Sequence, residues 1–300
     1  MTPQDFPRFD PEKPVAIIGA GVMGTKVAWA CARAGISTRL YDVEPGKAAS
    51  SIRLAQLWSA GAEADRVRQL LAAAPSLKEA QADTQLCFEN VPERLELKRS
   101  VLADMGAVAP ADAYLGSNAS SLLCTPLAEA SGRPERFFNL NFTDPRYGRL
   151  VELMISPTAA PQTIAFAKAW ARAVGMVPIR TRKEQHGYVF NRLWRAIKKE
   201  VLRQISEGYA TPQDIDRAWM LAFGTDIGPC GWMDDIGLHS ILAVERVYFE
   251  LSGQESDRPP KFLVDMVERG ELGAISGRGF YQHPGAAYHQ PGFLEAEDQA

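Results

Sequence analysis

The sequence predicts an α/β protein in which a doubly wound, mainly parallel sheet is followed by an all-helical domain. Two observations lead to this fold class. Short apolar runs alternate with helical patterns between about residues 15 and 180, which is typical of parallel strands joined by helical crossovers. Beyond Lys183 the apolar residues recur about every fourth position, as on the buried side of a helix. We therefore expect a sheet domain at 1–183 and a helical domain at 184–300.

The strands of the first domain are predicted from apolar runs that end at turn residues. We expect them at 15–18, 37–41, 85–89, 114–116, 137–142, 150–155 and 176–180. Helices are expected between them, at 27–34, within 44–74, after 93 through 105, and at 161–174. This alternation is the pattern of a doubly wound sheet.

The second domain begins with a long amphipathic helix. Its apolar residues are Leu193, Ile197, Val201 and Ile205, and Gly208 is a typical stop. A Thr-Pro pair at 211–212 indicates the start of another helix that runs to about 223. Further helices are expected at 238–251 and 260–270, and a loose tail from about 286.

Composition excludes several classes of protein. The chain has 300 residues, of which 46% are hydrophobic and 23% charged, as in ordinary globular proteins. A net charge of −3 without a long basic run gives no electrostatic recruitment to nucleic acid or to an anionic membrane. The segment 1–14 lacks the features of a signal peptide, and no apolar run has membrane-spanning length. We therefore expect a cytoplasmic protein.

The four cysteines are scattered and form no C-x-x-C pair. This spacing argues against a disulfide framework and against a zinc site. We expect buried thiols and no metal.

A glycine-rich turn, Gly19-Ala20-Gly21-Val22-Met23-Gly24, follows the first apolar run and opens a helix. The first glycine permits the tight turn, the second lets backbone amides approach a pyrophosphate, and the third lets helix and strand pack closely. The helix N-terminus then favours the anion. The sequence therefore predicts a Rossmann-type dinucleotide site.

Asp42 decides which dinucleotide is expected. It closes the second predicted strand, where a carboxylate accepts hydrogen bonds from a ribose 2'-hydroxyl and repels a 2'-phosphate. The sequence therefore favours NAD over NADP.

Several further motifs, in order and spacing, resemble the 3-hydroxyacyl-CoA dehydrogenase family. They are Glu89-Asn90-Val91-Pro92-Glu93-Arg94-Leu95-Glu96-Leu97-Lys98, Ser117-Asn118-Ala119-Ser120-Ser121-Leu122, Leu150-Val151-Glu152, Gly187-Tyr188-Val189-Phe190-Asn191-Arg192, Gly228-Pro229 and Gly277-Arg278-Gly279-Phe280-Tyr281. The resemblance covers residues 14 to about 283. It implies a Rossmann-type domain joined to a helical dimerisation domain, and hence a homodimer.

The resemblance also assigns roles to residues. Ser120 and Asn191 match a serine and an asparagine beside the reacting oxygen, and Glu152 matches a carboxylate that orients a histidine. The residues expected at the cofactor are Gly19, Gly21, Met23, Gly24, Asp42, Glu93, Lys98 and Asn118.

The family's histidine is missing. The family segment His-Phe-Phe-Asn-Pro reads Asn141-Phe142-Thr143-Asp144-Pro145 in this chain. Oxidation of an alcohol needs a group that takes the hydroxyl proton, and an amide cannot titrate near neutral pH. Asn141 can still donate a hydrogen bond to the reacting oxygen.

Three accounts of the altered site follow. Glu152 acts as the base itself or through a water, or Asp144 or His186 replaces the histidine, or the chain binds NAD without the family's reaction. The main expectation is an NAD-dependent dehydrogenase or ketoreductase acting on a hydroxyl beta to a carboxyl or acyl group. The altered segment favours a specialised substrate over ordinary fatty acyl-CoA, and whether that substrate carries CoA is open.

Overall fold

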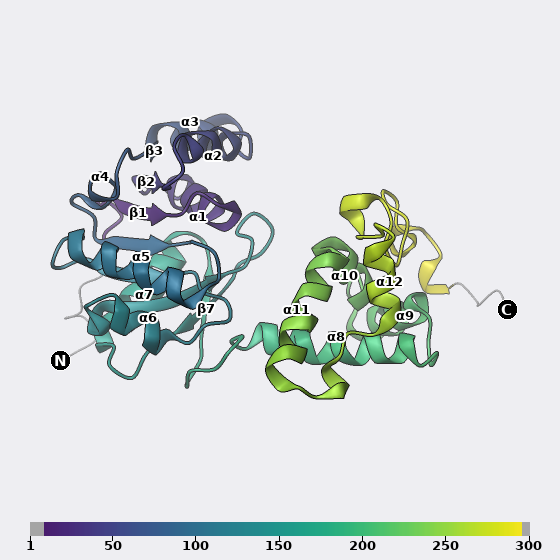
Figure 1. The fold of residues 1–300 in the computed structure, drawn as a ribbon. Helices are drawn as coiled ribbons and strands as arrows, with labels where there is room; N and C mark the ends of the chain where they lie inside the picture. The colour runs from purple at the N-terminus through teal and green to yellow at the C-terminus, as the bar shows by residue number, and fades with distance from the viewer. Residues whose placement is uncertain (1–8, 296–300) are drawn as a thin grey trace. The chain divides into compact units, whose positions relative to one another are not determined.

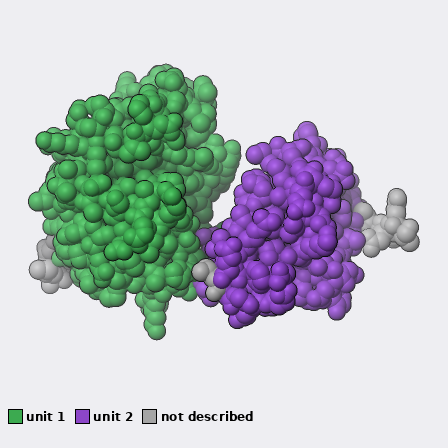
Figure 2. Space-filling view, viewed as in Figure 1, with its two compact units in different colours: residues 1–190 green, residues 191–300 purple. Residues whose placement is uncertain are grey.

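The computed structural model describes residues 9–295 of the chain, which divides into two compact units between Phe190 and Asn191. Figure 2 colours the two units separately. The first unit holds an eight-stranded sheet and the second is helical, so the predicted fold class is confirmed. The division lies shortly after the boundary expected at residue 183.

The first unit contains β1 (Val15–Ile18), β2 (Thr38–Tyr41), β3 (Leu71–Ala73), β4 (Leu86–Glu89), β5 (Tyr114–Ser117), β6 (Phe137–Phe142), β7 (Leu150–Met154) and β8 (Val177–Arg180). Its helices are α1 (Val22–Arg33), α2 (Lys47–Gln56), α3 (Gly61–Leu70), α4 (Leu77–Gln81), α5 (Leu95–Val108), α6 (Cys124–Ala130) and α7 (Pro161–Ala173). The strand order is β3-β2-β1-β4-β5-β6-β7-β8, and β6 with β7 is the antiparallel pair in a sheet whose other pairs are parallel.

Helices cover both faces of this sheet (Figure 1). On one face Ile17, Phe88 and Phe138 pack in a cluster with residues of α1, α2, α3 and α7. On the other face Ile18 and Cys87 pack with residues of α4, α5 and α6. Neighbouring residues of a strand point to opposite faces of the sheet, and helices cover both faces. Strands buried in this way appear in the sequence as continuous apolar runs.

The strand order places a crevice at the carboxyl end of β1. The chain runs from β1 to β2 on one side of β1, and β4 joins β1 on the other side. At such a switch point the connections leave in opposite directions and open a crevice where ligands bind in α/β proteins.

The glycine turn fits this crevice because its backbone is crowded. Gly19 has φ +97, and a Cβ added there would lie 2.8 Å from the carbonyl oxygen of Asn90. A Cβ added to Gly24 would lie 1.8 Å from the carbonyl oxygen of Gly19. Only glycine allows α1 to start this close to β1.

An aromatic cluster supports β6. Trp170 of α7 lies with ring centroids 4.8, 6.2 and 5.5 Å from those of Phe88, Phe138 and Phe142. All six residues of β6 are buried. The strand that carries Asn141 is therefore held rigidly in the core.

Three elements of the first unit differ from expectation, namely β3, α4 and α6. β3 has three residues, of which only Leu71 is buried, and it pairs with β2 from Thr38 onward. The helices have five and seven residues. Segments this short contain too few periods for an apolar pattern to be recognised.

The second unit contains α8 (Phe190–Ser206), α9 (Pro212–Phe223), α10 (Pro229–Ile236), α11 (Leu238–Ser252) and α12 (Lys261–Glu268). As predicted, Thr211 caps α9, because its hydroxyl accepts from the Asp214 amide at 3.2 Å. The segment after Gly228, where the sequence analysis placed no helix, forms α10. The carboxylate of Asp216 accepts from the Cys230 and Gly231 amides at its start.

Residues 286–295 are packed and not loose. Tyr288 and Phe293 are buried in the hydrophobic cluster of the second unit, and the rings of Tyr288 and Tyr281 form a T-shaped pair. The expectation of a loose tail failed here because aromatic residues scattered among glycines and prolines have no periodic pattern. Residues 296–300 lie outside the described range.

Burial of all four cysteines agrees with the expectation of unpaired thiols. Burial raises the pKa of Cys31 and of Cys124 to about 12. Over residues 9–295, no helix combines the length and the apolar character needed to cross a membrane.

Candidate active site

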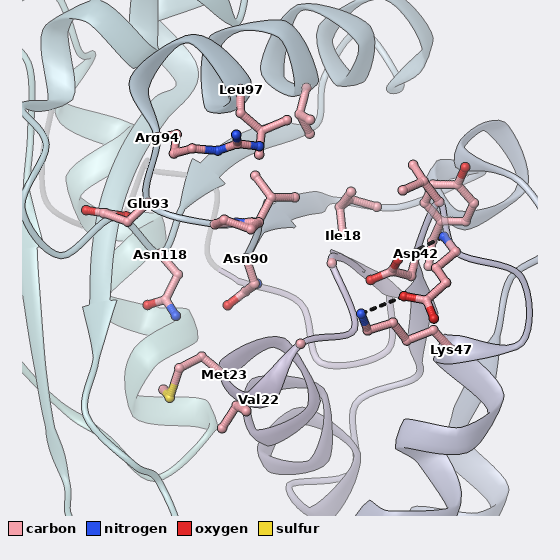
Figure 3. A pocket seen from close by; sticks show the side chains of 18 of the residues that line it. Ile18, Val22, Met23, Asp42, Lys47, Asn90, Glu93, Arg94, Leu97 and Asn118 are labelled. Atoms are coloured by element: carbon pink, nitrogen blue, oxygen red, sulfur yellow. Dashed lines mark hydrogen bonds and ion pairs between the residues drawn. The ribbon is translucent and has the colours of Figure 1, made fainter. Parts of the chain in front are cut away.

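A cavity of about 900 Å³ lies at the carboxyl ends of the strands of the first unit (Figure 3). It collects residues from the carboxyl ends of β1, β2 and β6, residues that follow β1, β2, β4 and β5, and residues of α4 and α5. They are Ile18, Gly19, Gly21, Val22, Met23, Tyr41, Asp42, Val43, Glu44, Lys47, Leu77, Asn90, Val91, Pro92, Glu93, Arg94, Leu97, Val101, Asp104, Asn118, Ser120, Asn141 and Phe142. Most of the predicted site residues therefore face one space.

The N-terminus of α1 opens onto this cavity. Gly21 is its N-cap and supplies no side-chain hydrogen bond, and the first turn contains no acidic residue. A Cβ added to Gly21 would have no atom within 4 Å, so the space in front of the turn is open. Free amides at a helix N-terminus that faces open space suit a pyrophosphate. Gly24 lies behind this turn and serves its packing.

Asp42 lies at the rim of the same cavity, at the end of β2. Its Oδ2 accepts from the Ala20 amide at 2.7 Å and its Oδ1 accepts from the Glu44 amide at 3.0 Å. These bonds hold the carboxylate in place beside the glycine turn. A fixed acceptor at this position matches a ribose diol and not a 2'-phosphate.

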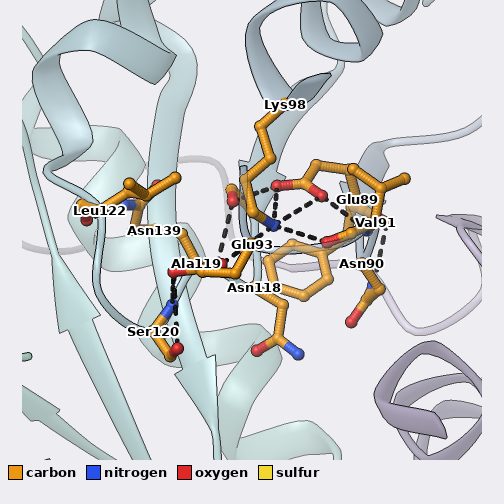
Figure 4. Close-up of polar contacts among 12 residues, drawn as sticks. Glu89, Asn90, Val91, Glu93, Lys98, Asn118, Ala119, Ser120, Leu122 and Asn139 are labelled. Atoms are coloured by element: carbon orange, nitrogen blue, oxygen red, sulfur yellow. Dashed lines mark hydrogen bonds and ion pairs between the residues drawn. The ribbon is translucent and has the colours of Figure 1, made fainter. Parts of the chain in front are cut away.

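Lys98 lies behind the cavity wall and does not line it. Its ammonium group donates to both oxygens of Glu89, at 2.9 and 3.0 Å, and to the Val91 carbonyl at 3.0 Å (Figure 4). The Ser117 hydroxyl and the Val91 amide also donate to Glu89. Burial raises the pKa of the Glu89 carboxyl, and Lys98 opposes that rise. Lys98 thus supports the segment after β4, and contact between Lys98 and a cofactor stays a prediction.

Glu93 connects this buried pair to the loop that carries Ser120. Its Oε1 accepts from the Ser120 amide at 2.8 Å, from the Ser121 amide at 2.7 Å and from the Ser121 hydroxyl at 2.9 Å. Its Oε2 lies 3.5 Å from the Lys98 ammonium group. The Ser120 hydroxyl is only 3.5 Å from Oε1, at the limit of a hydrogen bond, so it remains available to another partner.

Asn118 bridges the ends of β5 and β6. Its Oδ1 accepts from the Phe142 amide at 2.8 Å, next to Asn141. Ser120 and Asn141 are therefore brought to one wall of the cavity by neighbouring strands.

Asn141 and Glu152 form a cross-strand pair between β6 and β7. The Asn141 amide donates to Glu152 Oε2 at 3.4 Å, while Glu152 Oε1 accepts from the amides of Val189 and Phe190 at 3.0 and 2.8 Å. Asn141 lines the cavity, whereas Glu152 is 1% exposed and does not. The side-chain amide of Asn141 therefore lies between the Glu152 carboxylate and the cavity.

Asp144 is committed to ion pairs. It lies 2.7 Å from the ammonium group of Lys26 and 2.7 Å from the guanidinium of Arg146. Burial alone would raise the pKa of Asp144, but hydrogen bonds from Arg146 and Lys26 lower it to about 2. A carboxylate this weakly basic is a poor acceptor for a hydroxyl proton.

His186 lies on the loop before α8, within the first unit. Its Nδ1 is 2.7 Å from the Ser121 carbonyl oxygen. A carbonyl only accepts, so Nδ1 carries the hydrogen and Nε2 of the neutral ring keeps its lone pair. Asn191, by contrast, is the second residue of α8 and belongs to the second unit. Its place beside the reacting oxygen stays a prediction.

Sequence reasoning missed several residues of the cavity wall, among them Asn90, Arg94, Leu97 and Asp104. Asn90 directly follows a strand that was predicted, so its position at the strand end was a usable signal. The other three lie on or just before α5, and which side of that helix faces the cavity depends on packing.

Two family models together match most of the chain. The NAD-binding domain of 3-hydroxyacyl-CoA dehydrogenase matches residues 14–185, and the C-terminal domain of the same enzymes matches residues 187–283. The chain belongs to the 3-hydroxyacyl-CoA dehydrogenase family. It is an NAD-dependent dehydrogenase by this membership, and the open α1 N-terminus and Asp42 fit the cofactor.

Among similar proteins is a probable 3-hydroxybutyryl-CoA dehydrogenase of Deinococcus radiodurans, 30% identical over 89% of this chain and 99% of that protein. An L-carnitine dehydrogenase of a Pseudomonas species is 34% identical over 72% of this chain and 68% of that protein. A solved diketoreductase structure covers 92% of this chain and 100% of that chain, with a TM-score of 0.84 and 27% identity.

Removal of Lys98 tests the buried ion pair. We expect Lys98→Met to lower the free energy of unfolding by about 3–5 kcal/mol, because it leaves the buried Glu89 carboxylate without its counter-ion. Glu89 has a raised pKa, so protonation at lower pH removes the orphaned charge and the deficit shrinks as the pH falls. Urea denaturation at several pH values measures this. Arg99→Met is the matched control, since Arg99 pairs with Glu96 at the surface. Equal losses in the two variants would contradict the role of Lys98.

Asp42→Ala tests the ribose site. We expect the Kd for NADH to rise by roughly 10- to 100-fold, the loss of a charge-assisted hydrogen bond, and the preference over NADPH to fall. Fluorescence titration measures both dissociation constants. Glu44→Ala is the control, because Glu44 also lines the cavity but binds Lys47 at 2.8 Å. An unchanged preference for NADH would refute the assignment.

Proposed function

We propose that this dehydrogenase transfers hydride between NAD and a hydroxyl or ketone beta to a carboxyl or acyl group, on a specialised substrate and not on ordinary fatty acyl-CoA. The observation that carries the proposal is the cavity wall itself. Ser120 and Asn141 face the cavity that holds the glycine turn, and Asn141 stands where the family's histidine is expected. A site that keeps its hydrogen-bond donors but replaces the histidine that carries the proton suits a substrate other than ordinary fatty acyl-CoA.

In the proposed reaction, Ser120 and Asn141 donate hydrogen bonds to the substrate oxygen. The bound NAD supplies the hydride acceptor. Both donors are held in advance, Ser120 by the anchored loop and Asn141 by β6, so little reorganisation is needed as charge develops on the oxygen. Asn191 is proposed as a further donor.

Glu152 is the proposed proton carrier, directly or through a water. Two main-chain amides occupy its Oε1, while its Oε2 has only the long contact with the Asn141 amide. Oε2 is therefore the atom with capacity for a proton. Movement of the Asn141 side chain would open Glu152 Oε2 to the cavity.

His186 is the second candidate for this step. The Ser121 carbonyl orients its ring one residue from Ser120, with the lone pair on Nε2. Imidazole is also the side chain that most often serves as a general acid or base. Asp144 is the weakest of the three groups, since its pKa is about 2.

The relatives support a substrate outside ordinary fatty acyl-CoA. One similar protein is named for carnitine, a small hydroxy acid, and a similar structure is titled for dicarbonyl compounds. A CoA thioester stays within the proposal, because another relative is named for 3-hydroxybutyryl-CoA.

A substrate panel tests the function. The purified protein is given NAD or NADH with 3-hydroxybutyryl-CoA, free 3-hydroxy acids including carnitine, and beta-diketones, and formation or loss of NADH is followed. We expect the highest kcat/KM with a hydroxy acid or diketone. The highest kcat/KM with 3-hydroxybutyryl-CoA would overturn the specialised substrate. Tight NADH binding with no turnover of any compound would instead favour an NAD-binding protein that has lost the reaction.

Glu152→Gln separates the two proton carriers. We expect kcat to fall by roughly 100- to 10,000-fold, the usual contribution of general acid–base catalysis, while the Kd for NADH barely changes. His186→Gln keeps a side-chain donor for the Ser121 carbonyl and is expected to retain most of the activity. The opposite result, a large fall in kcat in His186→Gln with most of the activity kept in Glu152→Gln, would assign the proton transfer to His186.

Asn141→His restores the residue type of the family beside Glu152. We expect kcat with 3-hydroxybutyryl-CoA to rise by about 10-fold or more, because the ring can bond Glu152 on one side and face the cavity on the other. A new pH inflection close to the ordinary pKa of histidine, about 6.5, should appear in kcat/KM. Melting curves check that the variant folds. A folded variant without the gain would show that position 141 is not beside the reacting oxygen.

The second unit supports a homodimer. Large apolar side chains are exposed on α8, α9, α10 and α11, namely Leu193, Leu221, Phe223, Trp232, Ile236 and Val247. Contact with a partner would remove these side chains from water. We propose a second copy of the chain in the cytoplasm, where unpaired thiols persist. Light scattering at micromolar concentration should give twice the 32.9 kDa chain mass. A monomeric mass would contradict this.

A further inference from the structure

Asn90 has a polar atom that no described residue satisfies. It follows β4 directly and lines the cavity. Its Nδ2 donates to the Phe88 carbonyl oxygen at 3.3 Å, whereas its Oδ1 is buried and has no hydrogen-bond partner between residues 9 and 295. A buried acceptor without a partner costs stability. Gln81 and Asn139 also have such an oxygen, but of these three residues only Asn90 lines the cavity, where a bound ligand can supply the missing donor.

The contact with Phe88 sets the orientation of the amide. A main-chain carbonyl only accepts, so the nitrogen of Asn90 must face it. Rotating the amide by half a turn would place two oxygens against each other. The unpaired atom is therefore the oxygen, an acceptor, and Figure 3 shows the Asn90 side chain directed into the cavity.

The position of Asn90 selects the part of the cofactor that it meets. The main-chain N–H of Asn90 donates to the Ile18 carbonyl at 2.6 Å. A Cβ added to Gly24 would lie 3.1 Å from the Cβ of Asn90. It thus sits against the glycine turn, on the β4 side of β1. Asp42 lies on the opposite, β2 side, and Asn118 follows β5. Asn90 is therefore between the pyrophosphate position and the wall with Ser120 and Asn141.

We propose that Asn90 Oδ1 accepts a hydrogen bond from a hydroxyl of the nicotinamide ribose. An acceptor would repel phosphate oxygens, which the α1 N-terminus already suits, but it matches an O–H donor. The bond satisfies the buried oxygen and sets the rotation of this ribose, and with it the face that the nicotinamide presents to Ser120 and Asn141.

Binding measurements on the full chain test the proposal. Calorimetry gives the Kd of NADH, ADP-ribose and ADP for the parent and for Asn90→Leu, which keeps the shape of asparagine without its polar atoms. NADH and ADP-ribose carry the second ribose, and ADP lacks it. We expect Asn90→Leu to raise the first two Kd values by about 3- to 10-fold, as for one lost hydrogen bond, and to leave the Kd of ADP unchanged.

Asn139→Leu is the matched control. Asn139 also donates to a main-chain carbonyl, that of Leu122 at 3.3 Å, but does not line the cavity. Its variant should bind all three ligands as the parent does. Equal weakening of ADP, or an unchanged Kd for ADP-ribose in Asn90→Leu, would overturn the assignment. If melting curves show that Asn90→Leu does not fold, Asn90→Ala is titrated with the same three ligands and judged by the same outcomes.

Discussion

The close approach of two backbone segments, the turn after β1 and the segment after β4, is the constraint on which the site depends. Gly19 meets the carbonyl of Asn90, and Gly24 meets the carbonyl of Gly19, at distances that exclude any side chain. This crowding lets α1 start directly at the sheet edge, with its free amides facing the cavity. Without it, the crevice at the switch point would be filled by side chains and the pyrophosphate would lose its position.

A buried set of charges extends this constraint toward the reacting end. Lys98 neutralises Glu89 at the end of β4, and Glu93 in turn holds the amides of Ser120 and Ser121. The cofactor half and the proposed reacting half are thereby joined by hydrogen bonds within one unit. This arrangement explains why a lysine matched to the cofactor region in sequence has no free N–H toward the cavity: its three donors are already used.

Much of the fold was predictable because its signals are local. The four-residue strand β1, the glycine turn and the six-residue strand β6 were placed correctly from apolar runs and turn residues. β3 and α4 were missed, since three to five residues carry no period. Packing of Tyr288 and Phe293 was also missed, because it depends on partners distant in sequence, such as Tyr281.

The chain's own residues determined the Rossmann-type fold and the choice of NAD, because a glycine turn and a carboxylate at a strand end act through backbone geometry within one βαβ unit. Tertiary structure decided which charged groups are available. Strand register pairs Asn141 with Glu152. In the loop after β6, Asp144 forms ion pairs with Lys26 and Arg146. Burial and ion pairing of a side chain are set by segments far away in sequence, so a local pattern could name these carboxylates but could not rank them.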